Sequence, residues 1–175
     1  MSLTLMRDGA PVFAAVYDAM HDEMFHAQAG GGAFRNGAAM RVNARDSHYH
    51  GVVASNQPPF VCRHRKATAQ AGHSFSAMLR DVAAVRNFGP TSLQLAYVAC
   101  GRLDAFWEFG ADGFNCIGAV LLIREAGGIV TQADGMPYVL SAGSIAAAAP
   151  KVHAAMLLRL QESLGVAQMP AVLAA

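Results

Sequence analysis

The chain has 175 residues, of which 14% are charged and 54% are apolar. A chain of this length suits one domain, and we expect residues 1–175 to form a single one. A net charge of +1 gives no basic surface for nucleic acid or an acidic membrane, and no uncharged run reaches the roughly 18 residues of a membrane span.

The cysteines and the N-terminal residues indicate a cellular compartment. Cys62, Cys100 and Cys116 are odd in number and lack CxxC spacing, so the sequence indicates neither a disulfide framework nor a zinc site. Arg7 and Asp8 interrupt the first apolar segment too early for a secretory signal. We therefore expect a cytoplasmic protein, and the small share of charged residues favours a homo-oligomer.

The first 42 residues have the pattern of an antiparallel meander. Two Asx-Gly pairs, Asp8-Gly9 and Asn36-Gly37, favour tight hairpin turns between apolar segments. We predict strands at Ser2–Met6, Val12–Tyr17, Glu23–Gln28 and within Ala33–Val42.

The next segment, Asn43–Gln70, is polar, and Pro58-Pro59 excludes regular structure at its centre. Its basic cluster Arg63-His64-Arg65-Lys66 is either a solvated loop or a binding patch. A short strand is predicted at Gly51–Ser55, and a modest helix at Ala71–Asp81.

Strands and helices alternate in the second half of the chain. One helix, Asn115–Ala126, is apolar on all sides, which marks it as buried. The pattern indicates an α/β or α+β fold of layered sheets and helices. The remaining predicted elements are strands at Ala83–Asn87, Asp104–Phe109, Ile129–Gln132 and Ser144–Ala148, and helices at Thr91–Cys100 and Lys151–Leu164.

Three features could carry chemistry, and each also has a structural explanation. Glu108 at a strand end could accept a hydrogen bond from a substrate hydroxyl, or could be an exposed acid. The segment Gly89-Pro90-Thr91-Ser92 could dock an anion at a helix N-terminus, or could only cap that helix. Asn115 is a good N-cap residue for the buried helix. The pair His48-x-His50 lacks a third metal ligand and reads as surface histidines.

The run VRNFGPTSLQLAYVACGRLDAFWEFGADGFNCIGAVLLIREAGG (85–128) closely resembles the inositol monophosphatase family of Mg²⁺-dependent phosphatases. The resemblance extends to the Val-Tyr-Asp and Gly-Gly-Ala-Phe-Arg-Asn-Gly segments near the start and to the closing strand, turn and helix. It implies that Glu108 binds a substrate hydroxyl and that Gly89, Pro90 and Thr91 line the substrate site.

The same resemblance implies an incomplete metal site. The family's Trp-Asp pair, whose aspartate binds metal, reads Phe114-Asn115 here, and an amide is a weaker Mg²⁺ ligand than a carboxylate. The family's glutamate and Asp-Pro-x-Asp-Gly-Thr segments would precede the strand at Ser2–Met6. We therefore expect the C-terminal two-thirds of such a domain, truncated at the N-terminus, with an uncovered apolar face and a dimeric assembly.

Two hypotheses about function follow. In the first, the chain is a weakly active or inactive member of a family that hydrolyses inositol or sugar phosphate monoesters with Mg²⁺. In the second, it is a non-catalytic module that binds sugar phosphates or supports oligomerisation. Metal ligands supplied by a separate chain are a third and more remote possibility.

Overall fold

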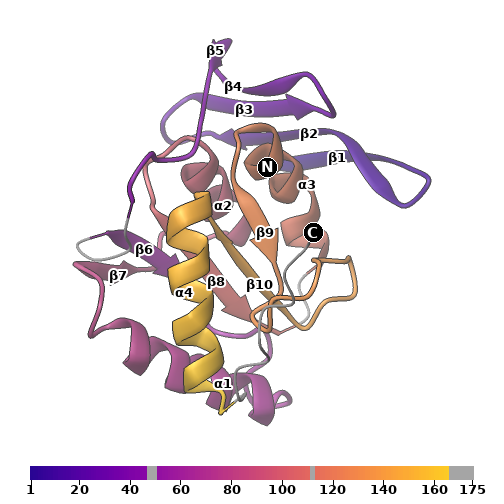
Figure 1. The fold of residues 1–175 in the computed structure, drawn as a ribbon. Coiled ribbons are helices and arrows are strands. Elements are labelled where there is room, and N and C mark those ends of the chain that lie inside the picture. Colours follow the sequence, from indigo (N-terminus) through magenta and orange to yellow (C-terminus); the bar gives the residue numbers. More distant parts are fainter. Residues whose placement is uncertain (47–50, 111–112, 166–175) are drawn as a thin grey trace, which may run out of the picture.

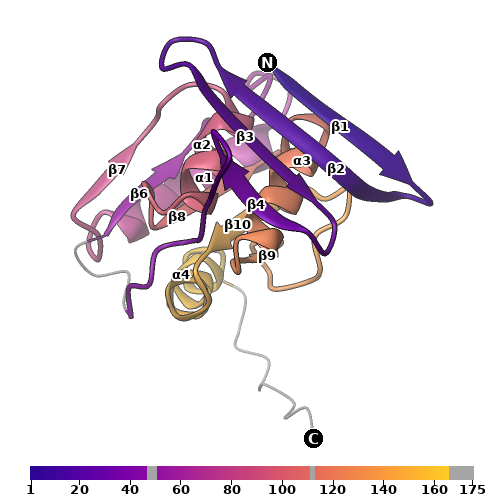
Figure 2. The same cartoon turned by 90° about the horizontal axis from the view of Figure 1, so that it is seen from above.

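The computed structural model describes residues 1–46, 51–110 and 113–165, and these residues form four layers. A five-stranded antiparallel sheet lies on one side, followed by a pair of helices, a five-stranded mixed sheet and a second pair of helices (Figures 1 and 2). The layered α/β architecture predicted from the sequence is confirmed.

The first sheet is the predicted meander, with strand order β1-β2-β3-β4-β5. Asp8 and Gly9 both have positive φ (51° and 76°), as do Asn36 and Gly37 (48° and 79°), so both hairpins turn where the Asx-Gly pairs predicted. The strands are β1 (Ser2–Arg7), β2 (Ala10–Asp18), β3 (Glu23–Gln28), β4 (Gly32–Arg35) and β5 (Ala38–Ala39).

The second sheet has the order β7-β6-β8-β10-β9. Its strand β6 pairs in parallel with both β7 and β8, whereas β10 runs antiparallel to β8 and to β9. The strands are β6 (Val52–Ser55), β7 (Ala84–Arg86), β8 (Ala105–Phe109), β9 (Ile129–Thr131) and β10 (Ser144–Ala148).

Two pairs of helices cover the sheets. Helices α2 (Thr91–Ala99) and α3 (Gly113–Glu125) lie between the two sheets, whereas α1 (Arg65–Met78) and α4 (Pro150–Ser163) cover the outer face of the second sheet (Figure 1). Side chains of α3 are buried around most of its circumference, as its all-round apolarity predicted.

Two local predictions were wrong. Helix α1 begins at Arg65 and ends at Met78, so Arg65–Gln70 is helical rather than irregular. The two prolines exclude regular structure only where they stand, and the following Arg, Lys, Ala and Gln residues favour a helix. Asn115 is the third residue of α3 and not its N-cap, because the helix begins at Gly113.

The core is divided by the second sheet into two clusters. Side chains alternate along β8, so Phe106 faces α2 and α3 while Trp107 and Phe109 face α1 and α4. Trp107 is fully buried, and its indole Nε1 donates to Ser74 Oγ on α1 at 2.9 Å. The side chains of α4 that pack on the sheet are Val152, His153, Met156 and Leu160.

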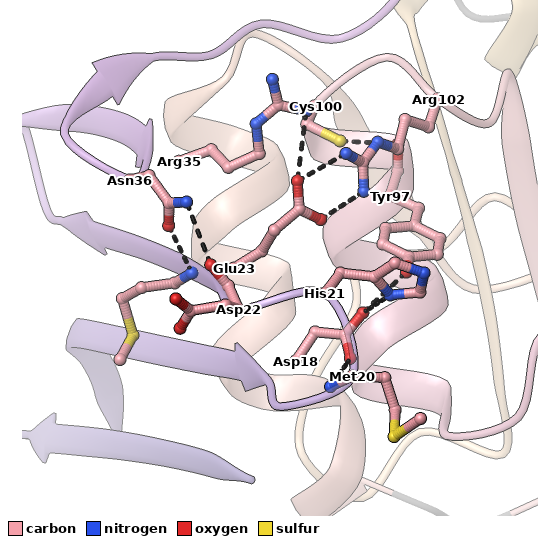
Figure 3. Close-up of polar contacts among 11 residues, drawn as sticks. Asp18, Met20, His21, Asp22, Glu23, Arg35, Asn36, Tyr97, Cys100 and Arg102 are labelled. Carbon is pink, nitrogen blue, oxygen red and sulfur yellow. Dashed lines mark hydrogen bonds and ion pairs between the residues drawn. The ribbon is translucent and has the colours of Figure 1, made fainter.

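A polar network fastens the β2–β3 hairpin to α2. Figure 3 shows Tyr97 and His21 converging on Asp18, with Tyr97 Oη 2.9 Å and His21 Nδ1 2.7 Å from Asp18 Oδ2. The hydrogen bond from His21 lowers the pKa of Asp18 against the opposing effect of burial, and Tyr97 lowers it further. Beside them, Arg102 pairs with Glu23 in bidentate fashion and lowers the pKa of that carboxyl.

Candidate functional site

The parallel strands bring three connections to one edge of the second sheet. Strands β6, β7 and β8 all point their carboxyl ends to this edge, where α1, α2 and α3 begin. The chain leaves β6 toward β7 on one side and leaves β8 toward β9 on the other. The gap between β6 and β8 is thus a topological switch point, where open α/β sheets bind their ligands.

Glu108 lies at this switch point. It is the fourth residue of β8, with Ile145 of β10 opposite to it, and its side chain faces the α2–α3 layer. Only 4% of Glu108 is exposed, so the interpretation as an exposed strand-end acid was wrong. A buried carboxylate is stable only with hydrogen-bond donors around it, so the neighbours of Glu108 must supply them.

Thr91 supplies one of these donors. Its hydroxyl Oγ1 lies 2.9 Å from Glu108 Oε2, and both residues are buried. The N-cap of α2 is Pro90 and makes no side-chain capping bond, so the alternative in which a side chain of this segment only caps the helix was wrong. Thr91 instead joins the start of α2 to Glu108, and the uncapped amides at this end remain a suitable environment for an anion.

Asn56 and Gln94 complete the group, and the sequence reasoning missed both. Asn56 follows β6, and its Nδ2 donates to Thr91 Oγ1 at 2.8 Å and lies 3.5 Å from Glu108 Oε2. Gln94 is fully buried, and its Nε2 donates to Asn56 Oδ1 at 2.8 Å and to the carbonyl of Gly89 at 2.9 Å. We call Asn56, Thr91, Gln94 and Glu108 the switch-point network.

Two sequence signals could have revealed these residues. Asn56 directly follows a strand and precedes a Pro-rich loop, which is where parallel strands present polar side chains. Gln94 is the one polar residue among Leu93–Ala99 apart from Tyr97, and it lies three positions after Thr91 on the same face of α2. Its amide also accepts from the backbone N–H of Phe88 at 3.0 Å, so it fixes the loop that holds Gly89 and Pro90.

Asn115 is exposed in the first turn of α3. The residue after it, Cys116, lines the same small pocket as Glu108. The structure places Asn115, Glu108 and Thr91 at one edge of the second sheet, and their roles toward a substrate stay predictions.

The described donors at this edge do not fit a two-metal centre. Mg²⁺ takes oxygen ligands and usually one or two carboxylates, and the switch-point network contains one carboxylate, already engaged by Thr91. Among residues 1–46, 51–110 and 113–165, no three His, Cys, Asp or Glu side chains gather in a way that could hold a metal ion. The His48–His50 pair lies outside these residues.

The chain matches proteins of known family along nearly its whole length. A sequence model described as the inositol monophosphatase family matches residues 1–165. An inositol-1-monophosphatase of Rhizobium meliloti is 40% identical over 146 residues, which cover 83% of this chain and 53% of that protein. A Nus factor SuhB of Pseudomonas aeruginosa is 35% identical over 164 residues, covering 94% and 60%.

The fold agrees with solved structures of the same group. An inositol monophosphatase from Anabaena has a TM-score of 0.84 at 31% identity, covering 92% of this chain and 65% of that one. The extragenic suppressor protein SuhB from Bartonella henselae has a TM-score of 0.85 at 31% identity, covering 92% and 60%.

The chain spans 53–60% of the length of the curated relatives it matches. No helix in the part of the chain that the structure describes is long and apolar enough to cross a bilayer. From the family match over residues 1–165 and the shared layered fold, this chain belongs to the inositol monophosphatase family.

Proposed function

We propose that the switch-point network binds the alcohol part of an inositol or sugar phosphate monoester through Glu108. The observation that carries the proposal is a carboxylate with 4% exposure held at the switch point by the Thr91 hydroxyl at 2.9 Å. A carboxylate can accept about four hydrogen bonds, so a substrate hydroxyl can join the donors of Thr91 and Asn56 around Glu108.

The supporting residues would act by positioning. Gln94 holds Asn56 and the Gly89 carbonyl, and Asn56 in turn donates to Thr91. The network thus fixes Glu108 relative to the start of α2, where Gly89, Pro90 and Thr91 would line the substrate. The amides of this helix end carry partial positive charge, which favours the phosphate group of the same ligand.

We propose that hydrolysis by this chain alone is weak or absent. Members of the family are typically Mg²⁺-dependent, and Mg²⁺ would activate water and neutralise charge on the phosphoryl group. The described residues provide one carboxylate at this edge and an amide at Asn115, which is a weaker donor set than Mg²⁺ prefers.

The alternative is a non-catalytic module that binds sugar phosphates or supports oligomerisation. The amide at position 115 favours it, since a neutral side chain stands where the family has a metal-binding aspartate. The two proposals differ in turnover and not in binding.

The test is a ³¹P NMR time course of the 175-residue chain with myo-inositol 1-phosphate and MgCl₂. Slow release of inorganic phosphate that stops in Glu108→Gln supports the weak enzyme, and Asn115→Asp should raise the rate. Ligand line broadening without any release supports the binding module. Release that is unchanged in Glu108→Gln would refute the role of Glu108 in both proposals.

The assembly and the compartment also stay proposals. The outer face of the first sheet exposes Leu3 (57%), Leu5 (59%) and Phe13 (36%), and this apolar surface supports a homo-oligomer, with a dimer as the simplest form. Sedimentation equilibrium at micromolar concentration tests it, and a monodisperse monomer would contradict it. The three free cysteines support a cytoplasmic location.

A further inference from the structure

A second cleft lies on the other face of β8, and we call it the α1 cleft. It encloses about 940 Å³ between the start of α1, the end of β8, the loop around Asp134 and the end of α4. Phe109 and Gly110 form its floor. Because side chains alternate along β8, Phe109 faces this cleft while Glu108 faces the opposite side of the sheet.

The basic cluster that the sequence left open as loop or binding patch forms one wall of the α1 cleft. Arg63, His64, Arg65 and Lys66 all line it. None of the four forms an ion pair with a residue that the structure describes, whereas Arg102, Arg45 and Lys151 elsewhere each pair with a carboxylate. The cluster therefore presents three permanent cations to the cleft.

The opposite wall adds little negative charge. Asp134 is the one carboxylate among the described lining residues, and its Oδ1 accepts a hydrogen bond from the backbone N–H of Met136 at 2.9 Å. The other polar side chains of the wall are the neutral Gln70, Gln132 and Ser144. Among the described lining residues, the positive charges therefore outnumber the negative ones.

The backbone reinforces this charge. His64 is the N-cap of α1 and makes no side-chain capping bond, and the first turn of this 14-residue helix contains no acid. A helix N-terminus carries partial positive charge, and here it opens beside the guanidinium of Arg65 and the ammonium of Lys66. Arginine suits phosphate oxygens through paired N–H groups, and lysine adds a point charge.

We propose that the α1 cleft binds a small anion with several phosphate charges. The volume of the cleft is within the roughly 300–1,000 Å³ of small-molecule sites. The net charge of the whole chain is only +1, so the positive charge of the cleft is a local feature and not part of an extended basic surface for nucleic acid. The site excludes Glu108 and does not depend on the proposed function. Gly110 and Ser144 also line the Glu108 pocket, so the two sites share one wall.

The experiment is isothermal titration of the 175-residue chain with inorganic pyrophosphate in the absence of Mg²⁺. The doubly substituted Arg65→Ala/Lys66→Ala chain should bind at least about tenfold more weakly, since one charge-assisted contact alone is worth about that factor. Arg7→Ala/Arg124→Ala removes the same charge from exposed positions elsewhere and should change affinity less than about twofold.

Two further variants sharpen the test. Asp134→Asn keeps the acceptor for Met136 but removes the carboxylate charge, so it should bind pyrophosphate more tightly than the unmodified chain. Glu108→Gln removes a carboxylate that does not line the cleft and should not weaken pyrophosphate binding, which separates this site from the switch-point network.

Several outcomes would overturn the proposal. These are no binding at millimolar pyrophosphate, equal losses in the two double variants, or loss only in Glu108→Gln. Tighter binding of a single-stranded oligonucleotide than of pyrophosphate would point to nucleic acid instead. If the Arg65/Lys66 variant fails to fold, unchanged or weaker binding by Asp134→Asn still refutes the proposal.

Discussion

Replacing Gln94 with leucine tests whether the switch-point network is held together by one buried amide. Gln94 has 0% exposure and makes three hydrogen bonds, to Asn56, to the Gly89 carbonyl and from the Phe88 N–H. Leucine has a similar size and makes none of them, so the variant removes hydrogen bonds with little change in volume.

The magnitude follows from these contacts. Three hydrogen bonds at a net value of about 0.5–1.5 kcal/mol each sum to roughly 1.5–4.5 kcal/mol. Burial of the apolar leucine offsets about 1–2 kcal/mol of this loss. Phe88 and Gly89 are exposed residues, so water can replace the lost hydrogen bonds to their backbone groups. We expect a net loss of about 0.5–2.5 kcal/mol in the free energy of unfolding, or a fall of roughly 1–10 °C in Tm.

Urea unfolding followed by circular dichroism measures this loss. Gln161→Leu is the matched control, because Gln161 is a helical glutamine with one hydrogen bond, to the carbonyl of Asp134, and its loss should cost less than about 0.5 kcal/mol. Equal values for the two variants, or a loss below about 0.5 kcal/mol for Gln94→Leu, would refute the organising role of Gln94.

Three further predictions concern the scaffold. Gly113→Ala places a Cβ 1.9 Å from the carbonyl oxygen of Leu140, so it should lower the free energy of unfolding in urea by more than about 2 kcal/mol; a neutral result would contradict the close packing there. Burial lowers the pKa of His153 in the folded chain. As the pH drops from 7 to 5, the unfolded chain therefore takes up the proton of this histidine before the folded chain does. The free energy of unfolding should fall by at most about 1.4 kcal/mol per pH unit. His153→Gln should flatten that slope in thermal melts, and an unchanged slope would exclude His153 as its source. Trp107→Phe deletes the buried bond to Ser74 and should cost about 1–3 kcal/mol; a double-mutant cycle with Ser74→Ala should show coupling, and additivity would count against the bond.

Local turn chemistry explains why the first sheet could be predicted to within a residue or two. Asp8-Gly9 and Asn36-Gly37 select hairpin turns, and the segments between them are apolar, so neighbouring strands pair in chain order. The bounds of α1 were missed because its polar first turn, Arg65–Gln70, resembles the loop before it.

The site was predicted only in part because its contacts are not local. Glu108 and Thr91 were identified as candidates, but their hydrogen bond joins residues 17 positions apart and depends on how α2 packs against β8. Asn56 lies 52 positions from Glu108 and becomes its neighbour only through the parallel pairing of β6 with β8. Periodicity and turn signals do not indicate which distant residues become neighbours, whereas the order of the strands in the sheet does.

Calorimetric titration with myo-inositol 1-phosphate tests the central claim most directly, using the 175-residue chain and its Glu108→Gln variant. Glutamine keeps an oxygen that accepts from Thr91 but removes the charge, so the network should persist while the substrate hydroxyl loses its strongest partner. We expect the unmodified chain to bind and the variant to bind at least about tenfold more weakly, since hydrogen bonds to charged groups are worth about 1.5–3 kcal/mol. Equal affinities, or no binding by the unmodified chain at millimolar ligand, would contradict the assignment of Glu108 as the substrate-binding residue.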